Sequence, residues 1–364
     1  MIQMAEAKLS REEIEAAVAV LESGALRQGK ICAEFEKKFA EKVGSKFALT
    51  CSSGTAALHL AYLACLQPDD EVLVSAFTFI ATASMVTMTG AIPVFCDVTP
   101  EEWVIDVKDA EAKITDKTKA IAPVHLFGNS CQVEAIGELA AEYGLKIIWD
   151  AAQAHGTRYK GADIGGLDDL VCYSFYPSKN MFTGEGGMVT TNSAELAEKI
   201  KFMRTHGQTD KYYHTMLGFN YRMTDVEAAI GLKQLERLDK MLAVRRRNGE
   251  IYNETLNRVE GIVPQLATSG CQHSFHQFCI LVDPDKFGMD RNELSEKLKE
   301  RDIATGIHYP RGLNRQPIFE ELYGYVDLYV TDFICERILA VPVHHGLSED
   351  QCRKVASCIV EFKR

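Results

Sequence analysis

Short apolar runs recur along the first half of the chain, and each is bounded by residues that favour turns. These runs are FALTC, EVLVSA, IPVFCD, AIAPVHL, KIIWDAA, LVCYSF and GMVTTN, with helix-like segments between several of them. Strands that are apolar along their whole length are typical of a parallel sheet that helices cover on both faces. The pattern therefore predicts an α/β domain around a mostly parallel sheet.

Length and helix periodicity predict two domains. A chain of 364 residues exceeds the size at which one hydrophobic core keeps growing. Thr224 and Asp225 begin a strongly periodic helix that continues into the charged stretch LDKMLAVRRRNGEIYNETL, a natural bridge between domains. We expect a large α/β domain over residues 1–245, opened by a helix that Ser10 caps, and a smaller α+β domain over residues 246–364. The smaller domain should have strands near HQFCILV and ATGIHY and helices near 291–301 and 348–360.

Charge, cysteine content and hydropathy argue against nucleic acid, metal ions and membranes as partners. The net charge is −11, and no run of Lys and Arg stands out, so nucleic acid is not an expected partner. The chain has eleven cysteines, an odd number with no Cys-x-x-Cys pair, which predicts reduced thiols and no metal site. It has no export signal and no apolar stretch long enough to cross a bilayer. We therefore expect a cytoplasmic protein that does not enter membranes.

A small-residue turn follows the first apolar run. Ser52, Ser53, Gly54 and Thr55 lie where FALTC gives way to the helical pattern of ALHLAYLA. Small residues let a ligand approach the backbone, and unpaired N–H groups at a helix start attract anions, so the turn could hold a phosphate. A plain helix N-cap explains the same residues, since Ser and Thr are favoured there.

Two charged residues, Asp150 and Lys179, occupy positions typical of catalytic residues. Asp150 directly follows the apolar strand KIIW, at the carboxyl end where ligands of open α/β sheets bind; it could instead cap a helix. Lys179, in SFYPSKNMFTGEGG, lies between an apolar strand and a Gly-rich turn. Apolar and hydroxyl neighbours can lower the pKa of a lysine and make it a nucleophile, although most lysines are simply solvated.

Taken together and in this order, these motifs resemble the DegT, DnrJ, EryC1 and StrS family of sugar aminotransferases. The resemblance extends over nearly the whole chain, through LESGALRQGKICAEFEKKFAEKVG, SSGTAALHLAYLA, SAFTFIATA, WDAAQAHG, SFYPSKNMFTGEGG, LGFNYRMTDVEAAIGLKQLERLD, HYPRGLNRQPIF and LAVPVHHGLSED. It implies fold type I of the pyridoxal-phosphate enzymes. In that fold a mostly parallel seven-stranded sheet lies between helices in the large domain, beside a smaller α+β domain.

The same resemblance implies roles around the cofactor. Lys179 would hold pyridoxal phosphate as a Schiff base and, once released, carry protons. Asp150 would pair with the pyridine nitrogen and keep it protonated, which makes the ring an electron sink. Gln153, one helical turn on, would lie near the phenolic oxygen, and Phe79 would stack on the opposite face of the ring.

Further family positions would bind the phosphate and complete the site. Gly54, Thr55 and Ser174 resemble the family's phosphate-binding residues. Asn220 resembles an Asn that reaches into the site from the neighbouring subunit, which implies a homodimer with shared active sites.

Substrate contacts are the least specific of these expectations. His308 and Tyr309 are well placed for substrate by resemblance, and Tyr176 is a further candidate, yet His and aromatic residues are more often structural. His155 is a weaker candidate of the same kind. Arg311 stands where the family commonly has a small or apolar residue, and it could bind an anion or form a surface ion pair.

The family activity is transfer of an amino group from an amino acid, with L-glutamate as the expected donor, to a nucleotide-linked keto-sugar. A 3- or 4-keto-6-deoxy sugar is the expected acceptor. Sugar dehydration is an alternative, although in its best-known type a histidine replaces the lysine equivalent to Lys179. A regulatory or non-catalytic relative of the same fold is another. A Rossmann dehydrogenase is not supported, because no Gly-x-Gly-x-x-Gly follows an early strand.

Overall fold

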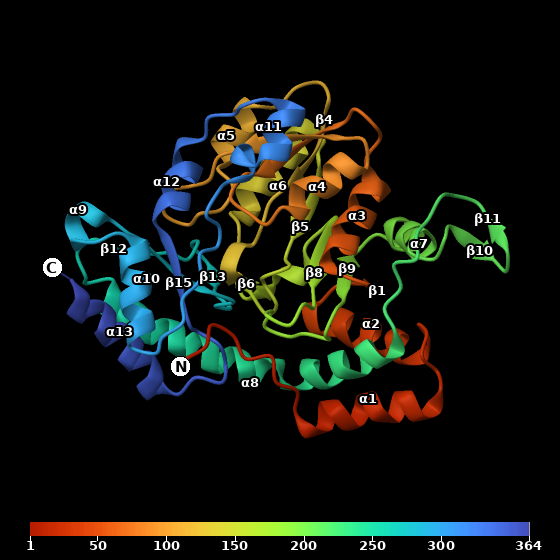
Figure 1. Ribbon diagram of the computed structural model, residues 1–364. Coiled ribbons are helices and arrows are strands. Elements are labelled where there is room, and N and C mark those ends of the chain that lie inside the picture. The colour runs from red at the N-terminus through yellow and green to blue at the C-terminus, as the bar shows by residue number, and fades with distance from the viewer. Residues whose placement is uncertain (364) are drawn as a thin grey trace.

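The computed structural model describes residues 1–363 and is built around one seven-stranded sheet (Figure 1). In sheet order its strands are β1 (Phe47–Cys51), β9 (Gly187–Thr191), β8 (Leu170–Ser174), β5 (Lys146–Asp150), β4 (Thr118–Ala122), β2 (Glu71–Ser75) and β3 (Ile92–Cys96). Strand β9 pairs antiparallel with both of its neighbours, and all the other pairs are parallel. Each of the seven predicted strands is present, and the predicted mostly parallel sheet is confirmed.

Both faces of the sheet are buried, which explains the uninterrupted apolar runs. In β5, Ile147 and Trp149 join one hydrophobic cluster, whereas Ile148 joins the cluster on the opposite face. The first cluster is covered by helices α2 (Lys30–Val43), α5 (Val107–Ala112), α6 (Val133–Tyr143) and part of α8 (Asp225–Leu256). The second is covered by α3 (Gly54–Cys65), α4 (Ala81–Met88) and α7 (Ala194–Met203).

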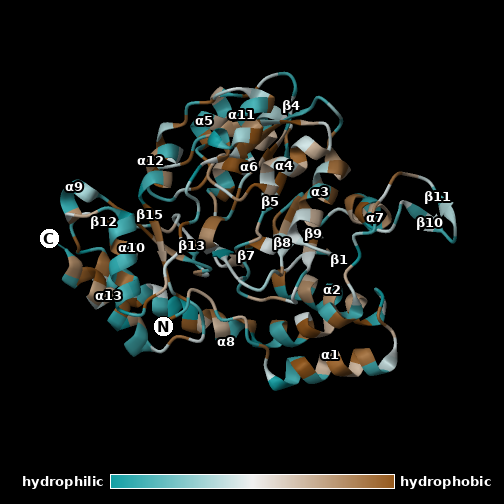
Figure 2. Ribbon diagram, in the orientation of Figure 1, coloured by the Kyte–Doolittle hydropathy of each residue, from teal (hydrophilic) through white to brown (hydrophobic). Residues whose placement is uncertain are grey.

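Helix α8 spans 32 residues along the base of the molecule (Figure 1). Thr224 caps it, because its hydroxyl accepts from the N–H of Glu227 and the Glu227 carboxylate accepts from the N–H of Thr224. The opening helix α1 (Arg11–Ser23), capped by Ser10 as predicted, lies beside the first part of α8, and α13 (Glu349–Phe362) packs on its last part. Hydrophobic and hydrophilic residues alternate along these helices in Figure 2, as expected for amphipathic helices.

The C-terminal third contains a three-stranded antiparallel sheet of β12 (Ile262–Pro264), β14 (Phe278–Val282) and β15 (Ile338–Val341). Its helices are α9 (Pro284–Phe287), α10 (Arg291–Glu300), α11 (Pro317–Tyr323), α12 (Tyr329–Arg337) and α13. The predicted strand in HQFCILV is confirmed as β14. The strand predicted in ATGIHY is wrong, because this segment makes only one isolated bridge, between Gly306 and Ala340.

The predicted domain boundary at residue 245 stays a prediction, and α8 runs through it without a break. After residue 309 the chain returns to the large sheet, where Leu313, Phe319 and Leu328 join the cluster beneath α3 and α4. Two further small sheets are present: β6 (Arg158–Tyr159), β7 (Ala162–Asp163) and β13 (Cys271–Gln272) form a three-stranded sheet, and β10 (Gln208–Asp210) and β11 (Tyr213–His214) form a two-stranded one.

No helix within residues 1–363 is long and apolar enough to cross a membrane. Across the same residues, no group of three or more His, Cys, Asp and Glu side chains is arranged to hold a metal ion. The cytoplasmic location remains a prediction from sequence.

Candidate active site

A cavity of about 510 Å³ opens at the carboxyl ends of β5 and β8, the edge at which ligands of α/β sheets bind. The predicted site residues that line it are Gly54, Thr55, Phe79, Asp150, Gln153, Ser174, Tyr176, Lys179, His308 and Tyr309. They come from segments far apart in sequence, which only the folded chain brings together. The three remaining candidates, His155, Asn220 and Arg311, do not line the cavity.

Asp150, the last residue of β5, is buried with 4% of its surface exposed. Its carboxylate accepts hydrogen bonds from the hydroxyl of Thr82 at 2.8 Å and from the N–H of Ala152 at 3.0 Å. Burial raises the pKa of Asp150, while these two hydrogen bonds and the nearby amine of Lys179 oppose that rise. Residues 151–157 form turns and not a helix, so the alternative that Asp150 caps a helix is wrong, and Gln153 does not lie one helical turn on.

Lys179 lies in the loop between β8 and β9, where its side chain lines the cavity. Burial lowers the pKa of Lys179 to about 8, and the carboxylate of Asp150 partly counters this. A substantial fraction of the amine is therefore neutral slightly above neutral pH. Lys179 is therefore not an ordinary solvated lysine, and its role as a nucleophile stays a prediction.

The turn before α3 is both a helix cap and part of the cavity wall. The Ser53 hydroxyl accepts from the N–H of Ala56, so the N-cap interpretation is correct for Ser53. Gly54 and Thr55 follow at the start of this 12-residue helix and line the cavity beside Ser174. A Cβ atom on Gly54 would lie only 2.6 Å from the Cβ of Ser174, so glycine is required for this close approach.

Aromatic residues form the mouth of the cavity. Phe79 and Tyr176 are 54% and 51% exposed, so they are not core residues. His155, in contrast, is 1% exposed, contacts the rings of Tyr173 and Phe175 at tilted angles, and does not line the cavity. His155 is therefore placed as a structural residue.

Asn220 and Arg311 are both exposed outside the cavity. Asn220 follows the β10–β11 hairpin, which stands out from the body of the molecule (Figure 1). Arg311 donates a hydrogen bond to the carbonyl of Arg315 at 3.3 Å. This chain alone therefore does not bring either residue to Lys179.

Sequence reasoning missed three residues at the site. Thr82 binds the Asp150 carboxylate, and its only sequence signal was its place in SAFTFIATA with Phe79. His276 and Glu185 line the cavity without a recognisable signal in the sequence. Their positions depend on the packing of β14 and of the Gly-rich turn against the large sheet.

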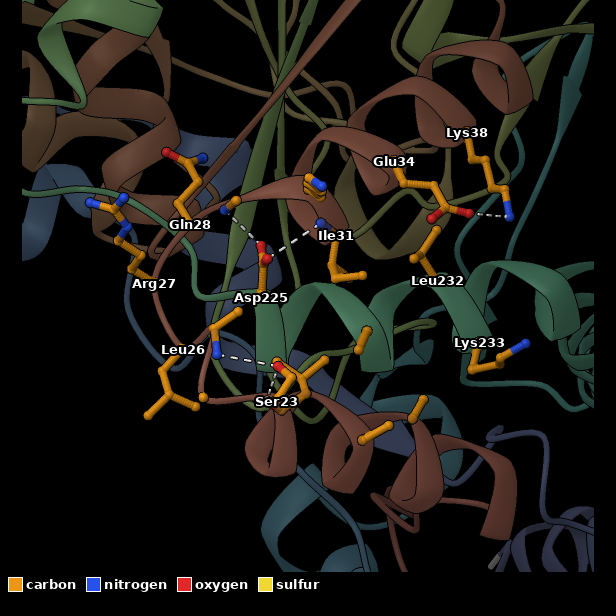
Figure 3. A pocket seen from close by; sticks show the side chains of 18 of the residues that line it. Ser23, Leu26, Arg27, Gln28, Ile31, Glu34, Lys38, Asp225, Leu232 and Lys233 are labelled. Atoms are coloured by element: carbon orange, nitrogen blue, oxygen red, sulfur yellow. Dashed lines mark hydrogen bonds and ion pairs between the residues drawn. The ribbon is translucent and has the colours of Figure 1, made fainter.

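A larger hollow of about 1010 Å³ lies between α1, the segment 24–30, α2 and α8 (Figure 3). It contains none of the predicted site residues. Asp225 points into it, yet its carboxylate already accepts from the backbone N–H groups of Gly29, Ile31 and Cys32 at 2.8–3.3 Å. This hollow offers no activated acid, base or nucleophile, so the smaller cavity is the candidate active site.

A buried acid and a lysine with a lowered pKa thus lie together at the carboxyl edge of a mostly parallel α/β sheet, a combination typical of enzyme active sites. Residues 7–360 match the model of the DegT/DnrJ/EryC1/StrS aminotransferase family, and the chain belongs to this family. The predicted resemblance is thus confirmed over nearly the whole chain. The family is one of amino-group transferases, as predicted.

Individual relatives agree with this assignment. The chain is 38% identical to a GDP-perosamine synthase of Caulobacter vibrioides, over 91% of this chain and 90% of that one. It is 39% identical to a pleiotropic regulatory protein of Geobacillus stearothermophilus, over 95% and 92%. The solved PLP form of a putative sugar aminotransferase, Spr1654 of Streptococcus pneumoniae, superposes with a TM-score of 0.92 at 26% identity, over 100% and 98%. The predicted fold type I architecture is therefore confirmed.

Proposed function

We propose that this chain binds pyridoxal phosphate in the 510 Å³ cavity and transfers an amino group from an amino acid to a nucleotide-linked keto-sugar. L-Glutamate is the proposed donor, and a 3- or 4-keto-6-deoxy sugar is the proposed acceptor. One observation carries the proposal. The Lys179 amine, with its pKa lowered to about 8, lines the same cavity as the buried Asp150 carboxylate, in a chain of an aminotransferase family.

The residues present fit the cofactor. A buried carboxylate such as Asp150 needs a cationic partner to stay ionised, and a protonated pyridine nitrogen would provide one. The N-terminus of α3, with Gly54, Thr55 and Ser174 at its opening, offers N–H and hydroxyl donors for a phosphate. The exposed ring of Phe79 at the mouth gives the cofactor ring an aromatic face to stack on.

The chain's own side chains would then divide the work. Bound pyridoxal phosphate supplies the electron sink for amino-group transfer. Lys179 would hold the cofactor through its amine and, once free, would carry a proton to or from the substrate carbon. Asp150 would keep the pyridine nitrogen protonated, and Gln153 would contact the phenolic oxygen. His308, Tyr309 and Tyr176 contact the substrate.

A homodimer would complete the site. Asn220 lies outside this chain's own cavity and follows a hairpin whose Tyr212 and Tyr213 are 84% and 64% exposed. Leu217, which lies between this hairpin and Asn220, is 93% exposed. We call residues 208–220 the arm. Apolar side chains left this open are typical of a surface that a partner covers. A second copy whose arm brings Asn220 to this cavity would account for both features.

A regulatory function is a second candidate, because one relative at 39% identity is named a pleiotropic regulatory protein. Both functions are compatible with a bound cofactor, so turnover distinguishes them. Sugar dehydration is a third possibility, and it differs in consuming no amino donor.

The absorption spectrum of the purified protein before and after addition of L-glutamate tests the proposal. We expect a visible band that falls as a shorter-wavelength band of the aminated cofactor rises, and we expect Lys179→Ala to lack the visible band. A bound cofactor that ignores every amino donor would favour dehydration or regulation. No band at all, even after addition of pyridoxal phosphate, would overturn the proposal.

A further inference from the structure

Residues 273–276 lie between β13 and β14, and His276 lines the candidate active site. We call these four residues the connector. Each of their backbone carbonyls accepts a hydrogen bond from a side chain elsewhere in the fold. The donors are Asn180, Arg245 and Arg246. The connector is therefore held from two sides, by the loop that carries Lys179 and by α8.

Two arginines of α8 hold one side of the connector. Nη1 of Arg245 donates to the carbonyls of Phe275 at 3.1 Å and of His276 at 3.2 Å, and Nε of Arg246 donates to that of His273 at 3.2 Å. Arg245 is 3% exposed, and burial lowers its pKa to about 10. A buried cation costs more free energy than an apolar side chain of similar size, so we attribute its presence to the two carbonyls.

The connector backbone is strained at its centre. Phe275 has a φ of 46°, a left-handed conformation that is unfavourable for a bulky aromatic residue. Its ring packs directly on α8 at Gly249, where a Cβ atom would lie 2.7 Å from the ring. Such a conformation persists only where surrounding contacts hold it, and it is found preferentially at functional sites. The hydrogen bonds from Arg245 are contacts of this kind.

Asn180 joins the connector to the lysine loop. It directly follows Lys179, is 1% exposed, and donates from Nδ2 to the carbonyls of Ser274 at 3.2 Å and of His155 at 3.4 Å. The N–H of Lys179 itself donates to the carbonyl of Tyr176 at 2.9 Å. An amide nitrogen that is shared between two buried carbonyls fixes the direction of the Asn180 side chain, and with it the backbone from which Lys179 extends.

We propose that Arg245 and Asn180 are positioning residues of the candidate active site, which act through the connector to hold the Lys179 amine and the His276 ring in the cavity. Neither Arg245 nor Asn180 lines the cavity. The proposal rests on the proposed function only in taking Lys179 as the reacting amine. Orientation of a reacting group contributes strongly to rate, so hydrogen bonds away from the cavity can control the chemistry within it.

The reactivity of Lys179 in the cofactor-free protein tests the proposal without any cofactor. The rate of acetylation of Lys179 by acetic anhydride, followed as a function of pH by mass spectrometry of the peptide that contains it, gives the pKa of the amine. We expect about 8 for wild type. In Asn180→Leu and in Arg245→Met the pKa should rise towards the ordinary value, because a released loop lets water reach the amine.

These two variants leave the charged surroundings of Lys179 in place. The titratable groups that face it are Asp150, His155, His276 and His308. A change in the pKa of Lys179 therefore reports its position and its exposure to water.

Turnover of the loaded enzyme is the second readout. We expect kcat to fall about 100-fold in both variants, the effect of a misplacement of about 1 Å, with a smaller change in KM for the amino donor. The double variant Asn180→Leu with Arg245→Met should lose less than the product of the two single losses, because both act through one connector.

A conservative variant and a matched control define the role of Arg245. Arg245→Lys keeps a cation that can donate to the connector carbonyls, so it should recover most of the kcat and the low pKa of Lys179. Arg247→Met changes a neighbouring arginine of α8 that donates to the carbonyl of Leu347 at 2.9 Å, outside the connector. It should leave both values within about twofold of wild type.

The outcomes separate this proposal from the proposed function. A raised pKa of Lys179 in both variants, recovered by Arg245→Lys, supports the positioning role, and Asn180→Leu tests it alone should Arg245→Met not fold. Variants that lose thermal stability while the pKa of Lys179 stays at the wild-type value would overturn it, and the proposed function would stand. A wild-type protein that does not bind pyridoxal phosphate would overturn the proposed function, whereas the acetylation result would remain.

Discussion

The hydroxyl of Thr82, on α4, donates a hydrogen bond to the carboxylate of Asp150, at the end of β5, over 2.8 Å. Thr82 is itself fully buried, so this bond lies beyond the reach of solvent. It favours the ionised form of Asp150 against the effect of burial, which raises the pKa of this carboxyl. Asp150, the proposed partner of the pyridine nitrogen, thus depends on a residue from a helix that covers the sheet.

Replacing Thr82 by Val should weaken the proposed interaction of the Asp150 carboxylate with the pyridine nitrogen of the cofactor. Valine has nearly the same shape but no hydroxyl, so the pKa of Asp150 should rise further. We expect kcat to fall about 10-fold, as for a lost hydrogen bond to a charged group, and the acid limb of the pH–rate profile to move to higher pH. Thr82→Ser keeps the donor and should restore both values. A Val variant with an unshifted acid limb would contradict this role.

The activated lysine should cost stability in the cofactor-free protein. Because the pKa of Lys179 is about 8 in the folded chain and 10.5 ordinarily, the unfolded state binds more protons between these values. Stability therefore rises with pH from 8 to 10.5, and below pH 8 the buried ammonium costs about 3 kcal/mol. Lys179→Met should be more stable than wild type by up to that amount at pH 7, with the difference vanishing near pH 10.5. Denaturant unfolding of wild type and Lys179→Met at pH 7 and near pH 10.5 measures this difference in stability. A difference that does not change with pH would refute the lowered pKa of Lys179.

Glycine at position 54 should be required for cofactor binding. Gly54→Ala would place a Cβ atom 2.6 Å from the Cβ of Ser174 and push the start of α3 away from the end of β8. We expect the affinity for pyridoxal phosphate to fall at least about 10-fold, because overpacking of this size costs about 1–3 kcal/mol. Gly137→Ala in α6, where nothing lies within 4 Å, is the control and should leave the affinity unchanged. Equal affinities of both variants and wild type would remove Gly54 from the proposed phosphate site.

Asp225 should contribute to stability more than an ordinary surface acid. Its carboxylate accepts from three N–H groups at the start of α2 while it also lies in the first turn of α8. Asp225→Ala should lower the free energy of unfolding by about 2 kcal/mol, the upper range for loss of a charged cap. Asp239→Ala, which breaks an exposed pair with Lys42, should lower it by less than about 1 kcal/mol. Thermal and denaturant unfolding compare the two variants. Equal losses of stability would contradict a role for Asp225 in capping α2.

The strands and their end residues could be predicted because their signals are local. Apolar runs such as KIIW indicate strands buried on both faces; Asp150 directly follows this run, and Lys179 lies in the loop after the run LVCYSF. The strand predicted in ATGIHY is absent because tertiary packing overrides the local pattern there. The run looks like a strand, but only Gly306 pairs with β15, because the chain turns towards the cavity at His308 and Tyr309.

By itself, the sequence determined the family, the seven strands, the capped helices and the lysine and aspartate of the candidate site. The family follows from the resemblance of the motifs, whereas the strands and capped helices depend on periodicity and on contacts a few residues apart. Only the tertiary structure decided that the Thr82 hydroxyl donates a hydrogen bond to Asp150 and that the Gln153 amide donates one to the hydroxyl of Tyr309, 156 residues away in the chain. A hydrogen bond between distant segments leaves no period in the sequence, because its partners meet only after the sheet and the C-terminal segment have packed together.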